Sequence, residues 1–115
     1  MAQIRDNRAI VRQLFDELAE IVRSQSARRP DGAETICVRD HDGGNYLVVR
    51  YGWRNDRRIR AVSLFVRICD GKVIVEEDLT DWGIVDRLIQ KGVAPEQVVL
   101  AWQSAESTAA EPIVV

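Results

Sequence analysis

Hydrophobic residues recur at steps of three and four positions over residues 1–26. The apolar positions are Ile4, Ile10 or Val11, Leu14, Leu18, and Ile21 or Val22, with charged and amide side chains between them. This spacing predicts one amphipathic helix. The segment that follows, Ser24 to Gly32, contains two arginines, a proline and an Asp-Gly pair. We expect it to end the helix and to turn the chain.

The middle of the chain is rich in β-branched and aromatic residues, interrupted by short polar turns. This pattern predicts strands over residues 34–40, 46–53, 58–69 and 72–76. The turns between the strands are Asp42-Gly43-Gly44-Asn45, Asn55-Asp56 and Asp70-Gly71. Residues of these types tolerate positive φ and make tight hairpins. Because parallel pairing would need long crossovers, the four strands are expected to form an antiparallel meander.

Helical spacing returns after the fourth strand. An apolar stripe is formed by Ile84, Val85, Leu88 and Ile89. Thr80 or Asp81 is the predicted N-cap, which would place Trp82 in the first turn. Lys91 lies where a cation suits the helix dipole, and Gly92 is placed to end the helix as the C′ residue.

The end of the chain completes one predicted domain over residues 1–115. Val98–Leu100 is expected to form a last short strand, and residues 104–115 form either a loose tail or a docking segment. The fold class is therefore α+β, an antiparallel meander of four to five strands with both helices packed on one face. The other face would be open to water or to a partner.

Composition and charge exclude several classes of protein. The formal net charge is −2, which argues against a whole-molecule field that attracts nucleic acid or anionic membranes. The two cysteines are too few for a disulfide framework and have no metal-binding spacing. With no secretory signal pattern and no apolar run of membrane-spanning length, the expected compartment is the cytoplasm. No metal or cofactor is predicted.

Candidate catalytic residues are few. The only histidine, His41, lies between two aspartates, Asp40 and Asp42, as a general base beside an acid would, but a solvated turn has the same composition. The acidic run Glu76-Glu77-Asp78 lacks the spacing of a calcium loop, and acids suit the start of a helix. No catalytic residue is assigned, and an enzyme is the weakest of the functional hypotheses.

Arginine and aromatic residues concentrate around the Asn55-Asp56 turn. The candidate interaction surface consists of Trp53, Arg54, Arg57, Arg58, Arg60 and, separately, Trp82, with Arg50 and Tyr51 flanking it. Tryptophan, tyrosine and arginine dominate protein–protein binding energy. Arginines beside aromatic rings can equally hold phosphates and stack bases. A third interpretation is a solvated arginine-rich turn with no partner.

An ordered set of short motifs from Gly52 to Trp102 resembles the XisI family, the fdxN-element excision controlling factor proteins of cyanobacteria. The matching features are Gly52-Trp53 before a basic turn, Asp70-Gly71-Lys72, Asp78-x-Thr80-acid, Gly83-Ile84, and Leu88…Gly92-Val93-x-Pro95-x-x-Val98-Val99-Leu100. The first helix and the strand from Tyr46 also fit the order of elements in that family. Leu79 departs from the family pattern, which has glycine there, and residues 103–108 keep little of the family's C-terminal segment.

The resemblance implies a non-catalytic controlling factor. Members of the family act with a nuclease-like companion of the XisH type, in support of a site-specific recombinase that excises a DNA element. The implied partner is therefore a XisH-type protein, and contact with nucleic acid would be indirect. Direct nucleic-acid binding through the arginine-rich hairpin is the alternative. A homo-oligomer is a further expectation, because an open sheet face or edge invites pairing.

Overall fold

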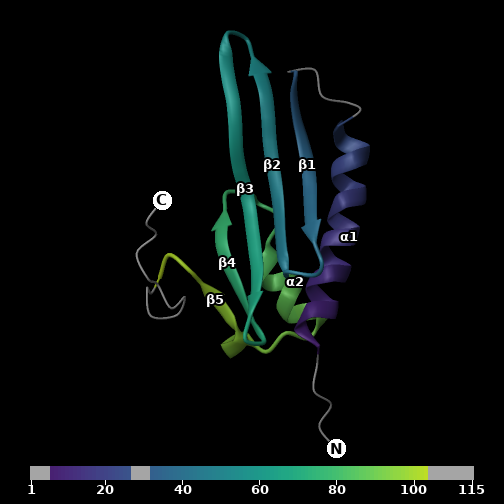
Figure 1. The fold of residues 1–115 in the computed structure, drawn as a ribbon, viewed down its shortest axis with the longest axis vertical. Coiled ribbons are helices and arrows are strands. Elements are labelled where there is room, and N and C mark those ends of the chain that lie inside the picture. Colours follow the sequence, from purple (N-terminus) through teal and green to yellow (C-terminus); the bar gives the residue numbers. More distant parts are fainter. Residues whose placement is uncertain (1–5, 27–31, 104–115) are drawn as a thin grey trace, which may run out of the picture.

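The computed structural model describes residues 6–26 and 32–103. Two helices and five strands, with one short 3-10 turn, follow one another along the chain (Figure 1). In chain order they are α1 (Asn7–Ser26), β1 (Ala33–Asp40), β2 (Asn45–Arg54), β3 (Arg57–Cys69), β4 (Lys72–Asp78), α2 (Ile84–Lys91), the 3-10 turn η1 (Pro95–Gln97) and β5 (Val98–Leu100). The predicted tail, residues 104–115, lies outside the described residues.

The five strands form one sheet in their sequence order, β1-β2-β3-β4-β5. The first four pair antiparallel, as the short turns predicted. The fifth strand pairs with β4 in parallel, with Val73 opposite Val98 and Val75 opposite Leu100. A parallel neighbour requires a crossover, and α2 lies within that crossover. The predicted α+β fold is confirmed, with a parallel fifth strand completing the meander.

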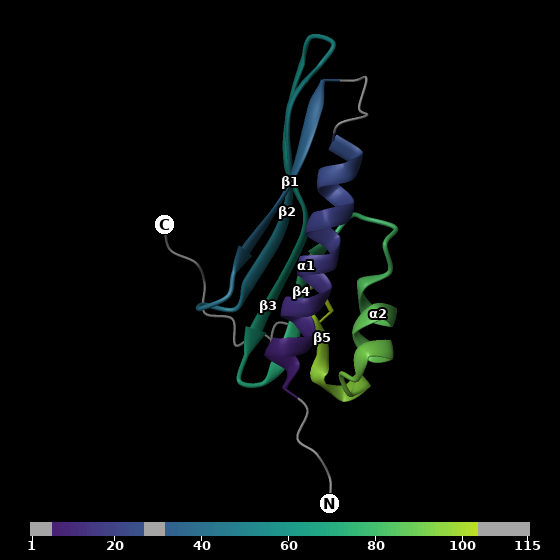
Figure 2. The same cartoon turned by 90° about the vertical axis from the view of Figure 1, so that its right-hand side faces the viewer.

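Both helices lie on the same face of the sheet, which is the inner face (Figure 2). The core is filled by buried apolar side chains from this face and from both helices. They include Val11, Leu14, Phe15 and Leu18 of α1, Tyr46, Val48, Leu64, Val66, Val73 and Val75 of the sheet, and Ile84 and Leu88 of α2. The opposite face, called the outer face below, carries no helix, as the sequence predicted.

The first helix begins at Asn7, and residues 1–5 of the predicted helix lie outside the described residues. Asp6 caps it, because its carboxylate accepts a hydrogen bond from the backbone N–H of Arg8 at 3.0 Å. Arg8 in turn donates to the carbonyl oxygens of His41 and Asp42, each at 2.9 Å. The start of α1 is therefore tied to the turn between β1 and β2.

The predicted N-cap of the second helix is wrong. The helix begins only at Ile84, after Gly83 in a left-handed conformation with φ 77°. The Asp78 carboxylate accepts hydrogen bonds from both the N–H and the hydroxyl of Thr80, at 2.9 and 2.7 Å. This local turn competes with helix formation, and Trp82 consequently precedes the helix. The predicted end is confirmed, since Gly92 has φ 117° and donates its N–H to Ile89.

The hairpin of β2 and β3 is the longest part of the sheet, and its tip projects beyond α1 (Figure 1). A β-bulge interrupts its register, with Val48 opposite Leu64 but Val49 opposite Val62. Ser63 is the extra residue, buried, and its hydroxyl donates to the Val48 carbonyl at 3.2 Å. Bulges increase the local twist of a strand. The strands therefore twist more strongly at Ser63, and the tip of the hairpin follows the direction that they take beyond this residue.

Two glycines with similar backbone conformations provide a matched test of packing at the turns. Gly44 and Gly71 have φ of +73° and +76°, but a Cβ on Gly44 would lie 3.1 Å from the Ile68 Cβ, whereas a Cβ on Gly71 would contact nothing within 4 Å. Left-handed strain costs an alanine about 1 kcal/mol at either site. We expect Gly71→Ala to lower the free energy of unfolding by about that amount, and Gly44→Ala by roughly 2–3 kcal/mol because its neighbours must also shift.

Urea unfolding followed by circular dichroism measures both losses. Equal destabilisation by the two variants would contradict the packing that places Gly44 against β3.

Candidate interaction surface

The structure brings five of the six predicted surface residues together on the β2–β3 hairpin. Cross-strand pairing places Trp53 opposite Arg58, and Arg54 opposite Arg57. Because side chains alternate along a strand, these two pairs lie on opposite faces of the hairpin. The register groups Tyr51, Trp53, Arg58 and Arg60 on the outer face, and Arg50, Arg54 and Arg57 on the inner face.

An exposed aromatic–arginine pair marks the outer side of the hairpin. The guanidinium carbon of Arg58 lies 5.6 Å from the centre of the Trp53 ring, within the range of a cation–π contact. The tryptophan remains 55% exposed. A large, partly shielded aromatic side chain on a projecting hairpin is well suited to enter a pocket on another molecule.

Like charges face each other at the tip of the hairpin. Arg54 and Arg57 are direct cross-strand neighbours, on either side of the Asn55-Asp56 turn. Directly opposed like charges destabilise a strand pair by a few tenths of a kcal/mol or more, up to about 1 kcal/mol. The tip of the hairpin therefore carries two adjacent positive charges.

Trp82 is not part of this cluster. It lies in the segment between β4 and α2, on the helix side of the sheet, and packs partly buried against the core. Arg87 covers it, with its guanidinium carbon 4.6 Å from the ring centre, and Arg87 also donates to the Trp82 carbonyl at 2.8 Å. Trp82 is therefore a candidate contact residue separate from the hairpin arginines.

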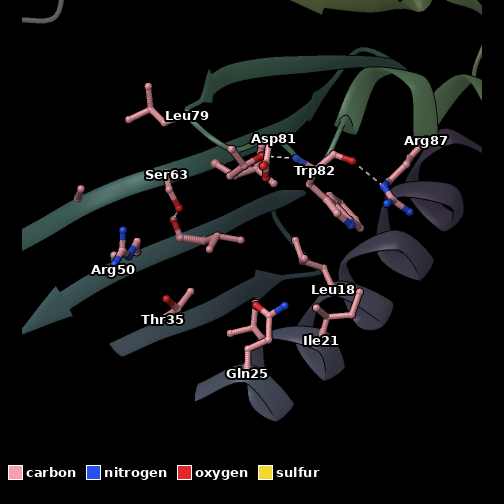
Figure 3. Close-up of a pocket in the computed structure, with 15 residues that line it drawn as sticks. Leu18, Ile21, Gln25, Thr35, Arg50, Ser63, Leu79, Asp81, Trp82 and Arg87 are labelled. Atoms are coloured by element: carbon pink, nitrogen blue, oxygen red, sulfur yellow. Dashed lines mark hydrogen bonds between the residues drawn. The ribbon is translucent and has the colours of Figure 1, made fainter. Parts of the chain in front are cut away.

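Trp82 instead lines a groove of about 560 Å3 that sequence reasoning missed (Figure 3). The groove lies between the second half of α1, the inner face of β1–β3, and the segment before α2. Leu18, Ile21, Val48 and Leu64 supply apolar lining, with Arg50, Arg87 and Asp81 also present. Leu79 is 70% exposed beside it. Of its lining residues, the sequence analysis had singled out Trp82 as a candidate contact and Leu79 as a departure from the family pattern.

His41 does not pair with either of the adjacent aspartates. Its Nδ1 lies 3.0 Å from the hydroxyl oxygen of Tyr46, and its Nε2 lies 3.9 Å from a carboxylate oxygen of Asp16. Asp16 also accepts a hydrogen bond from Arg39 at 2.6 Å. These contacts join the turn between β1 and β2 to α1, so His41 contributes to the packing of the turn.

The carboxylate of Asp40 stabilises the turn between β1 and β2. It accepts hydrogen bonds from the Asn45 side chain and from the Gly43 N–H, each at 2.9 Å. These bonds lower the pKa of Asp40, because both favour the ionised form. Asp40 is therefore a turn residue rather than an acid that orients the histidine.

The acidic run after β4 is also engaged within the fold. Glu76 accepts a hydrogen bond from Arg67 at 2.5 Å, and Asp78 accepts one from the Thr80 hydroxyl. Among the described residues, no group of three or more His, Cys, Asp or Glu side chains has the arrangement of a metal site. The described helices include none that is long and apolar enough to span a membrane.

The fold and the family of the chain are shown by comparison with known proteins. A crystal structure of the fdxN element excision controlling factor XisI from Anabaena variabilis ATCC 29413 superposes with a TM-score of 0.69, at 24% identity, over 87% of this chain and 92% of that one. A XisI-like protein from the same organism gives a TM-score of 0.66, at 22% identity, over 85% of this chain and 91% of that one.

No curated protein matches the sequence. The family model described as XisI protein matches residues 1–111. At this coverage, and with the same arrangement of helices and strands in the solved structures, the chain belongs to the XisI family.

Proposed function

We propose that the protein is a non-catalytic controlling factor that binds a XisH-type, nuclease-like companion. Through this companion it supports the regulated excision of a DNA element by a site-specific recombinase. Family membership over residues 1–111 carries the proposal, together with the description of the solved relative as an excision controlling factor. The contacts of His41 and Asp40 agree with it, because both side chains are used to hold a turn in place.

The tip of the β2–β3 hairpin is the proposed contact for the companion. Residues 50–60 contain five arginines and one aspartate, a net charge of +4 in a chain whose total is −2. The remaining residues therefore carry −6. Arginine forks bind carboxylates in a planar geometry, and the exposed Trp53 supplies apolar contact area. The expected complementary surface is acidic, with an apolar pocket for the tryptophan.

Direct nucleic-acid binding is a second candidate, and one observation favours it. Arginines lie on both faces of the hairpin, Arg58 and Arg60 on one and Arg54 and Arg57 on the other. A projecting arm of this kind can contact phosphates on two sides, while Trp53 offers a ring for base stacking.

Two equally exposed tryptophans allow a controlled test of the companion interface. Trp53 is 55% exposed on the hairpin, and Trp102 is 57% exposed after β5. The chain is co-expressed with a XisH-type, nuclease-like protein, and we expect the two to co-elute in size-exclusion chromatography. Trp53→Ala should weaken the complex at least about tenfold, as removal of an interface anchor does, and Trp102→Ala should leave the affinity within about twofold.

Titration calorimetry measures the affinities. Separate elution of the wild-type proteins would refute the proposed partnership. A complex that the two substitutions weaken equally would keep the partner but remove the hairpin as its contact.

The nucleic-acid hypothesis predicts a strong dependence on salt. If the hairpin binds phosphates, the logarithm of the binding constant falls linearly with the logarithm of salt concentration. Arg54→Ala combined with Arg57→Ala should then weaken binding to every sequence alike and reduce the slope by about 1.8, or roughly 0.9 per phosphate contact. Fluorescence anisotropy with duplex and single-stranded DNA gives both quantities. Binding that is absent or insensitive to salt removes this candidate.

A further inference from the structure

The outer face of the sheet carries a continuous apolar patch that neither helix covers. Ile36, Val38 and Val62 on this face are 42%, 40% and 38% exposed. Cross-strand pairing arranges the patch in two rows over β1, β2 and β3, which are Ile36–Val49–Val62 and Val38–Leu47–Phe65. Contiguous exposed apolar surface of this kind is typical of an interaction site.

Each end of the patch is closed by a polar row with the same order of charges. One row is Glu34–Tyr51–Arg60, and the other is Asp40–Asn45–Arg67. In both rows an acid lies on β1, an uncharged side chain on β2, and an arginine on β3. Over β1–β3 the outer face is therefore apolar in the centre, with an acid at each end of the β1 side and an arginine at each end of the β3 side, and Glu77 of β4 lies beyond Phe65.

We propose that this face binds the same face of a second copy of the chain, about a two-fold axis parallel to β2. With such an axis, each cross-strand row lies opposite the same row of the second copy, and β1 of one copy lies opposite β3 of the other. Ile36 then faces Val62 of the second copy, and Val38 faces Phe65 of the second copy. Apolar rows meet apolar rows, as the inner faces of two packed sheets do in a β-sandwich. The interface is isologous, so each of these contacts occurs twice.

The charges select this axis over the other simple arrangement. With the axis parallel to β2, Glu34 faces Arg60 of the second copy, and Asp40 faces Arg67 of the second copy. An axis in the plane of the sheet but perpendicular to the strands would instead place each strand opposite its own copy, and each polar row opposite the other polar row. Acid would then face acid along β1 and arginine would face arginine along β3. Like charges brought together in an interface are strongly unfavourable.

Glu34 and Arg60 form the more important of the two charge contacts. Arg60 is exposed and makes no ion pair with any described residue, and Glu34 holds only the Tyr51 hydroxyl, at 2.9 Å. Arg67 already donates to Glu76 within its own chain, at 2.5 Å. The Asp40 contact therefore adds less, and specificity for the second copy depends mainly on the Glu34–Arg60 pair.

Two charge reversals test the arrangement. Glu34→Arg places two arginines together on each side of the dimer at its hairpin end, and Arg60→Glu places two carboxylates together there. Each variant alone should weaken self-association by roughly a hundredfold, since the repulsion occurs twice. When the two monomeric variants are mixed, they should form a one-to-one heterodimer, because both charge contacts become attractive again. The double variant should also self-associate like the wild type.

Sedimentation velocity from submicromolar to high micromolar concentration measures these equilibria, and circular dichroism confirms that each variant is folded. Asp86→Arg and Arg12→Glu are the matched controls, because both residues are exposed on the helices, on the other side of the sheet from the patch. They should leave self-association unchanged.

A wild-type chain that stays monomeric throughout, or single variants that associate like the wild type, would overturn the proposal. Failure of the mixed variants to pair would overturn the axis. Protection of Ile36 and Val38 from hydrogen exchange only when the nuclease-like companion is added would assign the face to that protein instead. Self-association is measured on the chain alone, so its failure leaves the companion hypothesis standing, and the reverse also holds.

Discussion

A sheet with helices on only one face is the constraint on which the rest of this structure depends. The inner face buries a dense core, in which the rings of Phe15 and Tyr46 lie 5.1 Å apart and join α1 to the start of β2. Turn contacts made by Arg8 fix the start of the same helix against the sheet. The core uses both helices, so none is left for the outer face. Ile36, Val38 and Val62 on that face remain partly exposed, and burial against another molecule would be favourable.

The projecting hairpin has the same cause, because no described helix covers its tip. Beyond Gly52, where the pairing with β1 ends, the strands β2 and β3 pair only with each other, and two-stranded ribbons bury little apolar surface. Residues there contribute little to the core and are free to be charged, which explains why arginine is tolerated on both faces. The bulge at Ser63 separates this arm from the packed part of β3. The fold thus divides β3 into a half that stabilises the domain and a half that is available for contact.

Much of this architecture could be predicted from sequence because its signals are local. Asp70-Gly71 and Gly92 end their elements as expected, since a turn or helix end requires only the conformations of neighbouring residues. The start of α2 could not be predicted, because Asp78 uses Thr80 for a turn of its own. The order of charges across the outer face could not be predicted from the sequence either. It depends on which residues become cross-strand neighbours, and the bulge at Ser63 shifts that register by one residue in a way that composition does not reveal.

The two proposed surfaces also have a geometric relation to each other. A two-fold axis parallel to β2 leaves the direction of the strands unchanged, so both hairpin tips of a dimer would project from the same end. The two copies of Arg54 and Arg57 would then lie at the same end of the assembly, on its two sides. Two linked weak contacts raise the apparent affinity for a partner that can engage both, because the second contact forms within the same complex. A duplex or a two-fold symmetric companion satisfies that condition. The pairing of the outer faces would therefore raise the affinity of the arginine arms, of which only Arg60 takes part in the pairing itself.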